Sequence, residues 1–121
     1  MNSSTIITKY FDAISRRDIA GIRSCICHDA TLKFGDFKMS GVETIIQGYQ
    51  MFFKSIQAYS LEIIHIWECN ETVIIVEGET VGRNAAGNSF TVPFASVFEL
   101  KNNRISHQRD YFDPGKMLQK N

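Results

Sequence analysis

The stretch TVIIVEGETVGR at residues 72–83 decides the predicted fold class, because its side chains alternate with the period of two that is typical of a β-strand. One face of this strand is apolar or small, and the other carries two carboxylates. The first face holds Ile74, Val76, Gly78, Thr80 and Gly82, and the second holds Ile75, Glu77, Glu79 and Val81. We expect the first face to pack against helices and to leave unfilled volume beside its small residues.

The same period of two begins near Tyr59 and continues almost to the C-terminus. It predicts four strands, at about 59–69, 72–83, 89–100 and 104–112. One face of the third strand holds Phe90, Val92, Phe94, Ser96 and Phe98. Periodicity leaves two alternatives open for the inward face of the fourth strand. These are Ser106, Gln108, Asp110 and Phe112, or Ile105, His107, Arg109 and Tyr111.

The N-terminal half of the chain has helical patterns instead. Apolar residues recur every three or four positions over about 4–16, which predicts an amphipathic helix. Asp18 is the predicted N-cap of a second, shorter helix. The inward residues of that helix are Ile19, Ile22 and Ile26. Residues 29–39 fit a short strand or a hairpin.

A third helix is predicted to begin at a capping box formed by Ser40 and Glu43, in which each side chain satisfies a free backbone amide of the first turn. Its apolar face consists of Val42, Ile45, Ile46, Tyr49, Phe53 and Ile56. Three helices followed by an antiparallel meander predict an α+β domain, with the helices packed on one face of the sheet.

The composition is that of one globular domain covering residues 1–121. Hydrophobic residues make up 44% of the chain, and thirteen basic residues balance thirteen acidic ones. A net charge of zero gives no electrostatic support for a nucleic-acid or membrane partner. Met1–Thr5 is short and polar and leads into no signal sequence, so we expect a cytoplasmic protein.

The spacing of cysteine and histidine predicts neither a disulfide framework nor a metal site. The chain has three cysteines, which is an odd number, and no two of them have the spacing of a zinc motif. Cys25 and Cys27, followed by His28, are interpreted as residues at a helix end whose thiols pack against the core. We therefore expect no bound metal.

Short motifs distributed over nearly the whole chain point to a known superfamily. They are YFDAISRRD at residues 10–18, HDATL at 28–32, VFEL at 97–100, RIS at 104–106 and RDYFDP at 109–114. Together they resemble the nuclear transport factor 2-like superfamily, which includes SnoaL-like polyketide cyclases, ketosteroid isomerase and limonene-epoxide hydrolase. The resemblance implies a cone-shaped α+β fold, in which three N-terminal helices pack on a curved, mostly antiparallel sheet.

The ketosteroid isomerases use a tyrosine on the first helix and two carboxylates. Tyr10 matches that tyrosine, and Tyr49 matches a supporting tyrosine on the third helix. The position of the base falls near Phe34, and that of a protonated aspartate falls at Ala95 or Ser96. Both carboxylates are missing, so the resemblance disfavours steroid-type isomerisation.

The limonene-epoxide hydrolases use an aspartate–arginine–aspartate set, and Asp110 matches one of the aspartates. The other two positions fall near Gly78 and Thr80, so that set is incomplete. SnoaL-like cyclases use a single aspartate base in an apolar pocket without a cofactor, and the chain is most similar to this group. The resemblance therefore implies that Asp110 faces the pocket, with Gln108 and Phe112 beside it.

The predicted catalytic residues are Asp110 as the base and Tyr10 as a hydrogen-bond donor. The predicted substrate-binding residues are Tyr49, Phe34, Phe53, His65, Trp67, Phe94, Gln108 and Phe112. His65 and Trp67 are included because they share one face of the strand at 59–69. The alternatives are structural: an Asp110 paired with an arginine or tyrosine, a Tyr10 in the core, and a His65 with a satisfied imidazole.

We expect a cofactor-free enzyme of cyclase, isomerase or hydrolase type. It would act on a hydrophobic, cyclic or carbonyl-bearing small molecule between the helices and the sheet. A non-catalytic ligand-binding domain and a protein-interaction module are the alternatives. A cavity with a desolvated Asp110 favours the enzyme, and a cavity without a positioned acid or base favours the binding domain. A filled core with an exposed apolar outer sheet favours the interaction module.

We also expect a homodimer that forms through the outer face of the sheet. Ile75, Val81, Val97 and Tyr111 lie on the faces opposite the predicted pocket, mixed with charged residues as at a non-obligate interface. The resemblance adds support, because many members of the superfamily pair in this way.

Overall fold

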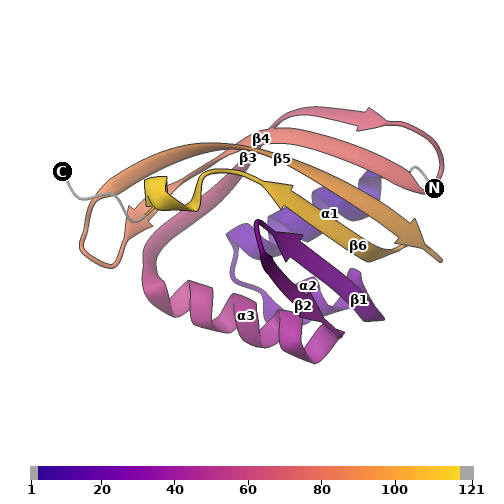
Figure 1. The fold of residues 1–121 in the computed structure, drawn as a ribbon, viewed down its shortest axis with the longest axis horizontal. Coiled ribbons are helices and arrows are strands. Elements are labelled where there is room, and N and C mark those ends of the chain that lie inside the picture. The colour runs from indigo at the N-terminus through magenta and orange to yellow at the C-terminus, as the bar shows by residue number, and fades with distance from the viewer. Residues whose placement is uncertain (1–2, 118–121) are drawn as a thin grey trace.

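In the computed structural model, residues 3–117 form three α-helices, a six-stranded sheet and a final 3₁₀ helix (Figure 1). The helices are α1 (Ser4–Ser15), α2 (Ile19–Ser24) and α3 (Val42–Ser55), and the 3₁₀ helix covers Pro114–Met117. The strands are β1 (Ile26–Phe34), β2 (Phe37–Ser40), β3 (Ile56–Glu68), β4 (Val73–Asn84), β5 (Ser89–Lys101) and β6 (Arg104–Tyr111). The predicted α+β fold class is confirmed.

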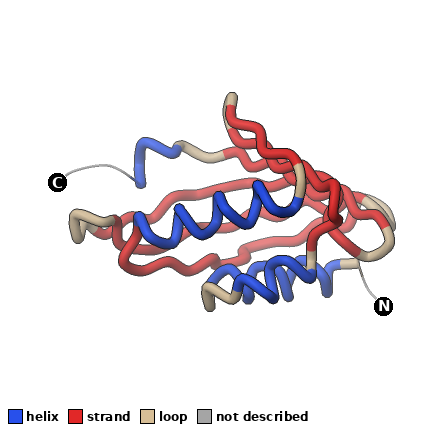
Figure 2. Tube along the Cα trace, turned by 90° about the horizontal axis from the view of Figure 1, so that it is seen from below, coloured by secondary structure: helices blue, strands red, loops and turns tan. Residues whose placement is uncertain are grey.

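The sheet has the strand order β2-β1-β6-β5-β4-β3, and β1 and β6 are its parallel pair. Strands β3 to β6 form the predicted meander. The segment left open as a strand or hairpin is the β1–β2 hairpin, which pairs with β6 and extends the sheet. The three helices lie on the same face of the curved sheet, and its other face is uncovered (Figures 1 and 2).

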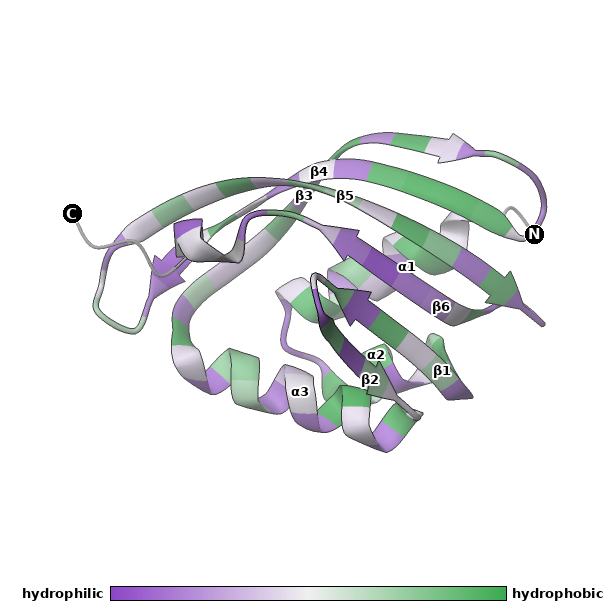
Figure 3. Cartoon of the chain, viewed as in Figure 1, coloured by the Kyte–Doolittle hydropathy of each residue, from purple (hydrophilic) through white to green (hydrophobic). Residues whose placement is uncertain are grey.

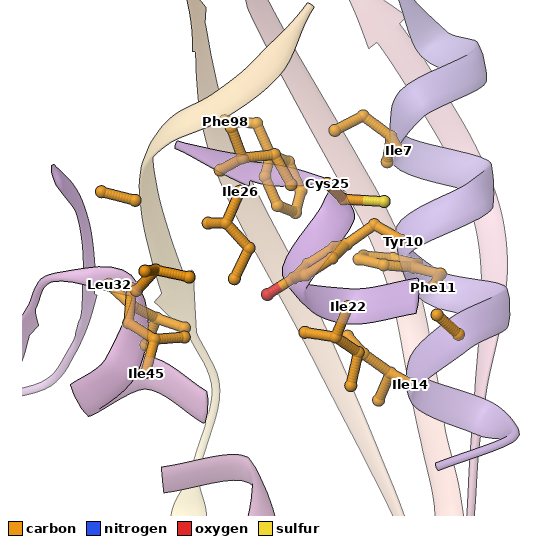
Figure 4. Packing of buried hydrophobic residues seen from close by; sticks show 14 of the residues in the cluster. Ile7, Tyr10, Phe11, Ile14, Ile22, Cys25, Ile26, Leu32, Ile45 and Phe98 are labelled. Atoms are coloured by element: carbon orange, nitrogen blue, oxygen red, sulfur yellow. The ribbon is translucent and has the colours of Figure 1, made fainter. Parts of the chain in front are cut away.

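The core lies between this helical layer and the sheet. Ile7 and Tyr10 of α1 are completely buried, and the ring of Tyr10 packs edge-on against Phe98 of β5, with 6.1 Å between the ring centroids. Figure 4 shows the hydroxyl of Tyr10 pointing away from α1 into the core. Burying a large apolar side chain stabilises a protein by about 1.5–3 kcal/mol, so this amphipathic stripe holds α1 on the sheet.

The turn between α1 and α2 contains the predicted helix cap. The Asp18 side chain accepts a hydrogen bond from the backbone N–H of Gly21 at 3.0 Å, which confirms Asp18 as the N-cap. The preceding Arg17 adopts a left-handed backbone conformation, with φ 56°. Its guanidinium donates at 3.0–3.3 Å to three carbonyl oxygens at the junction of α3 and β3, those of Phe53, Ile56 and Gln57. Arg17 thereby joins the helical hairpin to α3.

Replacing Arg17 with methionine should lower the free energy of unfolding by about 1–2 kcal/mol, because the last carbonyl groups of α3 lose their donor. Arg16 provides the matched control, since it pairs with the exposed Asp12. Arg16→Met should change the free energy by less than about 0.5 kcal/mol. Urea unfolding followed by circular dichroism measures both variants, and equal losses would contradict a special role for Arg17.

The start of α3 differs from the prediction. Ser40 belongs to β2 and pairs with Thr31, and Gly41 is the N-cap residue, with φ 90°. The predicted capping box of Ser40 and Glu43 is therefore wrong, because the hairpin holds the serine in the sheet. Glu43 instead forms an ion pair with Arg23 of α2.

Two isoleucines assigned to helices belong to strands. Ile26 opens β1 directly after α2, and Ile56 opens β3 directly after α3. Both side chains are buried. The helical spacing of apolar residues continues through each junction because the chain keeps its inward side while the backbone changes conformation.

A β-bulge in β3 reverses the predicted face of its second half. Ile64 is an extra residue, inserted where the pairing with β4 shifts by one. Ile63 before the bulge and Ile66 after it both pack against the core. His65 and Trp67 consequently lie on the uncovered face, where Trp67 is 45% exposed. The prediction that these two residues line the pocket is wrong.

A second bulge, in β6, resolves the open question of its inward face. Ser106 is an extra residue, because the pairing with β5 shifts between Ile105 and His107. Ile105 and Gln108 are therefore both buried, although they belong to opposite sets of the predicted alternation. Beyond the bulge, the inward face continues through Asp110.

The predicted inward faces of β4 and β5 are confirmed, and Figure 3 shows hydrophobic and hydrophilic residues alternating along β5. The glycines of β4 do not leave the expected empty volume. The rings of Phe94 and Phe90 lie over their cross-strand partners Gly78 and Gly82, and a Cβ on either glycine would approach a ring carbon to 2.8 Å. The volume beside the glycines is filled by these rings.

Candidate functional site

A cavity of about 1000 Å³ lies between α3, the β1–β2 hairpin and the inward face of the sheet. Its wall is mostly apolar and includes Leu32, Phe34, Tyr49, Phe52, Phe94 and Phe112. Phe37 and Met51 also line it and are 66% and 72% exposed, so the cavity opens to solvent beside them. A volume of this size accommodates a small organic molecule.

Asp110 of β6 is the carboxylate of the cavity wall within residues 3–117. Ser96, its cross-strand neighbour on β5, donates from Oγ to Asp110 Oδ1 at 2.7 Å. Gln108 Nε2 donates to both Oδ1 and Oδ2, at 3.0 and 3.1 Å. Within residues 3–117, Oδ2 accepts nothing beyond this shared contact, so it is the oxygen with capacity left to bind a proton.

Burial raises the pKa of Asp110 above its ordinary value, and the hydrogen bonds from Gln108 and Ser96 oppose this shift. Among residues 3–117, no cation pairs with Asp110. The neighbouring Arg109 points to the opposite face of β6, where it pairs with Glu99 at 2.5 Å. The alternative of an Asp110 paired with an arginine or a tyrosine is therefore not what the structure shows.

Two tyrosines set the orientation of the Gln108 amide. The Tyr10 hydroxyl donates to Gln108 Oε1 at 2.6 Å, and it is also hydrogen-bonded to the Tyr49 hydroxyl. Because Tyr10 has one hydrogen and gives it to Gln108, Tyr49 must donate to Tyr10. Burial raises the pKa of both tyrosines, so both stay protonated at neutral pH. The chain of donors thus ends at the Asp110 carboxylate.

The structure brings several of the predicted site residues together on the cavity wall. They are Phe34, Tyr49, Phe94, Gln108, Asp110 and Phe112. Strands β1, β5 and β6, helix α3 and the segment after β6 supply them. Their roles in binding or catalysis stay predictions, but their positions are compatible with contact to one bound molecule.

The other predicted residues lie elsewhere. Tyr10 is completely buried beneath the wall, which corrects its predicted role, because it can act on a bound molecule only through its partners Gln108 and Tyr49. Phe53 belongs to the core, where its ring stacks on Tyr49 and lies under the guanidinium of Arg17. His65 and Trp67 contact each other on the uncovered face of the sheet, with 4.1 Å between their ring centroids.

Ser96 and Tyr59 are among the polar residues of the wall that the sequence-based prediction missed. Ser96 lies on the predicted inward face of β5, but only the register with β6 shows that it donates to Asp110. Tyr59 pairs with Gly82 at the start of β3, on the inward face before the bulge. A polar side chain on that otherwise apolar face was the available signal.

Within residues 3–117, no group of three or more His, Cys, Asp or Glu side chains is arranged to hold a metal ion. The three cysteines have free thiols, of which Cys25 is buried and Cys69 is exposed. None of the helices in this part of the chain has the length and apolar character needed to cross a membrane.

Solved structures with the same arrangement define the class of fold. A nuclear transport factor 2-like protein of unknown function from Burkholderia pseudomallei has a TM-score of 0.89 at 21% identity, over 98% of this chain and 95% of that one. A protein from Shewanella denitrificans, proposed to be a SnoaL-like polyketide cyclase, has 0.85 at 16% identity, over 96% and 93%. An LEH-like epoxide hydrolase from M. tuberculosis has 0.82 at 16% identity, over 96% and 86%. The chain thus has the nuclear transport factor 2-like fold.

The family follows from the sequence match. Residues 7–108, which are most of the chain, match the model of the SnoaL-like domain. The chain therefore belongs to the SnoaL-like domain family, as its motifs indicate. No curated protein is similar enough in sequence to match it.

Asp110→Asn should leave the free energy of unfolding at pH 7 unchanged or raise it. Below the ordinary pKa of about 3.9, Asp110 is protonated in both the folded and the unfolded state. As the pH rises, the unfolded state releases this proton first, so the folded state loses stability from the ordinary pKa upward until the pH passes the raised folded-state pKa. The advantage of the variant should therefore grow from about pH 4 to pH 7.

Urea unfolding at several pH values measures this difference. Asparagine keeps Oδ1, which accepts the bonds from both Ser96 and Gln108. The substitution therefore removes the charge and, of the hydrogen bonds, only the second contact of Gln108, to Oδ2. Asp36→Asn, at an exposed carboxylate of the β1–β2 turn, is the control. A loss of about 1–3 kcal/mol at pH 7 for Asp110→Asn would make this carboxylate a structural acceptor instead.

Proposed function

We propose that the protein is a cofactor-free acid–base enzyme that acts on a hydrophobic, carbonyl-bearing small molecule, with Asp110 as its general base. The observation that carries this proposal is the environment of Asp110. Its carboxylate lies at an apolar cavity, has no paired cation within residues 3–117 and keeps Oδ2 able to accept a proton. A carboxylate desolvated in this way is a stronger base than one in water.

The proposed reaction begins at a carbon next to the carbonyl group. The C–H bond breaks, the proton moves to Asp110 Oδ2, and the C–H electron pair forms the double bond of an enolate, whose oxygen receives the carbonyl π pair. An isomerase then returns the proton to a different carbon. A cyclase joins the enolate carbon to a second carbonyl carbon, and the new alkoxide takes the proton back from Asp110. Both routes conserve electrons within the substrate, so neither requires a redox cofactor.

The surrounding hydrogen bonds suit this role. Ser96 and Gln108 fix the plane of the carboxylate, and the Tyr49–Tyr10 pair fixes the amide of Gln108. Such a preorganised base does not have to be reoriented when a substrate binds. The largely aromatic wall supplies the binding energy for an apolar molecule.

At the positions that match the catalytic residues of other superfamily enzymes, this chain lacks their acids and bases, which favours chemistry with a single carboxylate. Phe34, which lies where the resemblance places the isomerase base, is an aromatic part of the cavity wall. Gly78 and Thr80 lie where it places two members of the epoxide hydrolase set, and neither is an acid or a base. The solved neighbours include both a proposed cyclase and an epoxide hydrolase, so their names support no single reaction.

A non-catalytic ligand-binding domain is the second candidate. The observation in its favour is that Asp110 is the one carboxylate of the wall within residues 3–117, so an apolar molecule could occupy the cavity without reacting. The protein-interaction alternative expects a filled core, and the cavity of about 1000 Å³ argues against it.

Proton–deuterium exchange distinguishes the enzyme from the binding domain without knowledge of the natural substrate. 2-Tetralone, a compact benzo-fused cyclic ketone, should exchange its α-protons in D₂O faster with the protein than in buffer. The rate should rise with pH as Asp110 ionises, and Asp110→Asn should lower it by roughly 100-fold or more. Proton NMR follows the exchange.

Asp36→Asn again serves as the control and should exchange the ketone at the rate of the unmodified chain. Binding of 2-tetralone with no exchange above buffer would identify a ligand-binding domain. Exchange that persists in Asp110→Asn would assign the base to another group.

We further propose that the chain forms a homodimer through the uncovered face of the sheet. This face carries apolar side chains from four strands, and the helices cover only the other face (Figure 1). Among its exposed residues, Ile64 is 59% and Tyr111 is 58% accessible. Half-buried Ile75, Val81 and Val97 lie on the same side.

Light scattering at micromolar concentration should give the mass of two chains. Tyr111→Lys should shift the mass toward one chain, because it replaces an exposed aromatic ring of the proposed interface with a charge. Gln50→Lys, on an exposed position of α3, is the control and should leave the mass unchanged. A one-chain mass for the unmodified protein would refute the dimer.

A further inference from the structure

The hydroxyl groups of the cavity wall differ in whether they already have a hydrogen-bond partner in the protein, and this difference bears on how a substrate is held. Within residues 3–117, four wall residues with a hydroxyl group are buried or half-buried: Tyr49, Tyr59, Thr80 and Ser96. Thr80 donates to the carbonyl oxygen of Val92 at 3.2 Å, Ser96 donates to Asp110, and Tyr49 is hydrogen-bonded to Tyr10. The Tyr59 hydroxyl has no hydrogen-bond partner among these residues.

The ring of Tyr59 is nevertheless held firmly. Phe52 of α3 packs edge-on against it, with 4.7 Å between the ring centroids and an interplanar angle of 89°. The ring also contacts the small apolar cluster of Ile56, Phe90 and Val92. A ring fixed in this way keeps its hydroxyl in one region of the cavity, so the missing partner does not result from a loosely packed side chain.

The proton of Tyr59 stays on its oxygen at neutral pH. Burial raises the pKa of this hydroxyl, and electrostatic interactions with Tyr49 and Asp110 raise it further. Tyr59 is therefore a donor and not a base. Tyr59 and Asp110 line the same cavity, although Tyr59 lies on β3 and Asp110 on β6, with β4 and β5 between them.

We propose that Tyr59 is a catalytic residue that donates a hydrogen bond to the carbonyl oxygen of a ketone substrate while Asp110 Oδ2 faces the adjacent carbon. This inference rests on the proposed function. When Asp110 removes the α-proton, the carbonyl π pair moves to the oxygen, and the bond from Tyr59 stabilises the negative charge that develops there. The substrate class is thus a neutral, apolar ketone with an acidic C–H bond next to the carbonyl group.

The expected geometry follows from the two groups. A ligand oxygen is the partner that the Tyr59 hydroxyl lacks, and a neutral acceptor suffices because the donor is uncharged. The oxygen must lie at the β3 side of the cavity, and the reacting carbon must lie at the β6 side. A molecule without an oxygen acceptor can fill the same apolar volume but leaves Tyr59 unpaired, which costs affinity.

The test compares 2-tetralone with tetralin, the same ring system without the oxygen, in the full chain and in Tyr59→Phe. The carbonyl stretch of bound 2-tetralone, measured by infrared difference spectroscopy, should lie at lower wavenumber in the unmodified protein than in Tyr59→Phe. Calorimetry should show that Tyr59→Phe weakens 2-tetralone binding by roughly 3- to 10-fold and changes tetralin binding by less than about twofold.

Tyr111→Phe is the matched control, because it removes a hydroxyl from an exposed tyrosine of the uncovered face. It should change neither the carbonyl stretch nor the affinity. Tyr59→Phe should unfold at the same temperature as the unmodified chain, since its hydroxyl has no partner in residues 3–117 to lose. An unchanged carbonyl stretch in Tyr59→Phe would overturn the proposal, as would a cavity that binds 2-tetralone no better than tetralin.

The α-proton exchange separates this proposal from the one on which it rests. Exchange that is slowed by both Tyr59→Phe and Asp110→Asn supports both. A Tyr59-dependent carbonyl shift without any exchange confirms Tyr59 as the donor to the ligand but refutes Asp110 as a base. If exchange depends on Asp110 but the carbonyl stretch is the same in Tyr59→Phe as in the unmodified chain, the proposed function stands and this inference is refuted.

Discussion

The desolvation of the Asp110 carboxylate is the constraint on which the rest of the site depends. A carboxylate at an apolar wall is costly unless hydrogen bonds replace part of its lost hydration. Ser96 and Gln108 provide these bonds, and Gln108 can do so only because Tyr10 holds its amide oxygen. The chain from Tyr49 to Asp110 therefore joins α3, α1 and β6. The arrangement that satisfies the half-buried carboxylate also ties α1 and α3 to the sheet.

Sequence patterns predict this fold wherever the backbone is regular. They fail where the backbone changes conformation but the pattern of hydrophobic residues along the chain does not change. The helical stripe of α1 and the strand faces of β4 and β5 follow directly from spacing. The bulges at Ile64 and Ser106 each insert one residue. Apolar side chains on both sides of Ile64 hide the first shift, and the polar residues that follow Ser106 mark no inward face that would reveal the second. The junctions at Ile26 and Ile56 are hidden for the same reason, since both residues stay buried.

The candidate site could be predicted only in part, because a polar side chain acquires its role from its partners. The motif around Asp110 identifies the carboxylate. The same resemblance selects Tyr10 as the donor, yet the structure commits the Tyr10 hydrogen to Gln108 and leaves that of Tyr59 without a partner in residues 3–117. Whether a hydroxyl is already hydrogen-bonded within the protein or can bind a ligand depends on strand register and on packing across several elements. No local pattern of residues predicts this.

The charge of a ligand is constrained by the same desolvation that makes Asp110 basic. An anionic group beside the ionised carboxylate would be repelled strongly, because little water screens the two charges. A cationic group would attract the carboxylate, lower its pKa and so remove the basicity that burial provides. A neutral ligand preserves the raised pKa and can displace further water from Oδ2 on entering the cavity. If Asp110 is the base that we propose, the electrostatics of the site therefore favour a neutral apolar ligand, whose binding would make Asp110 a stronger base.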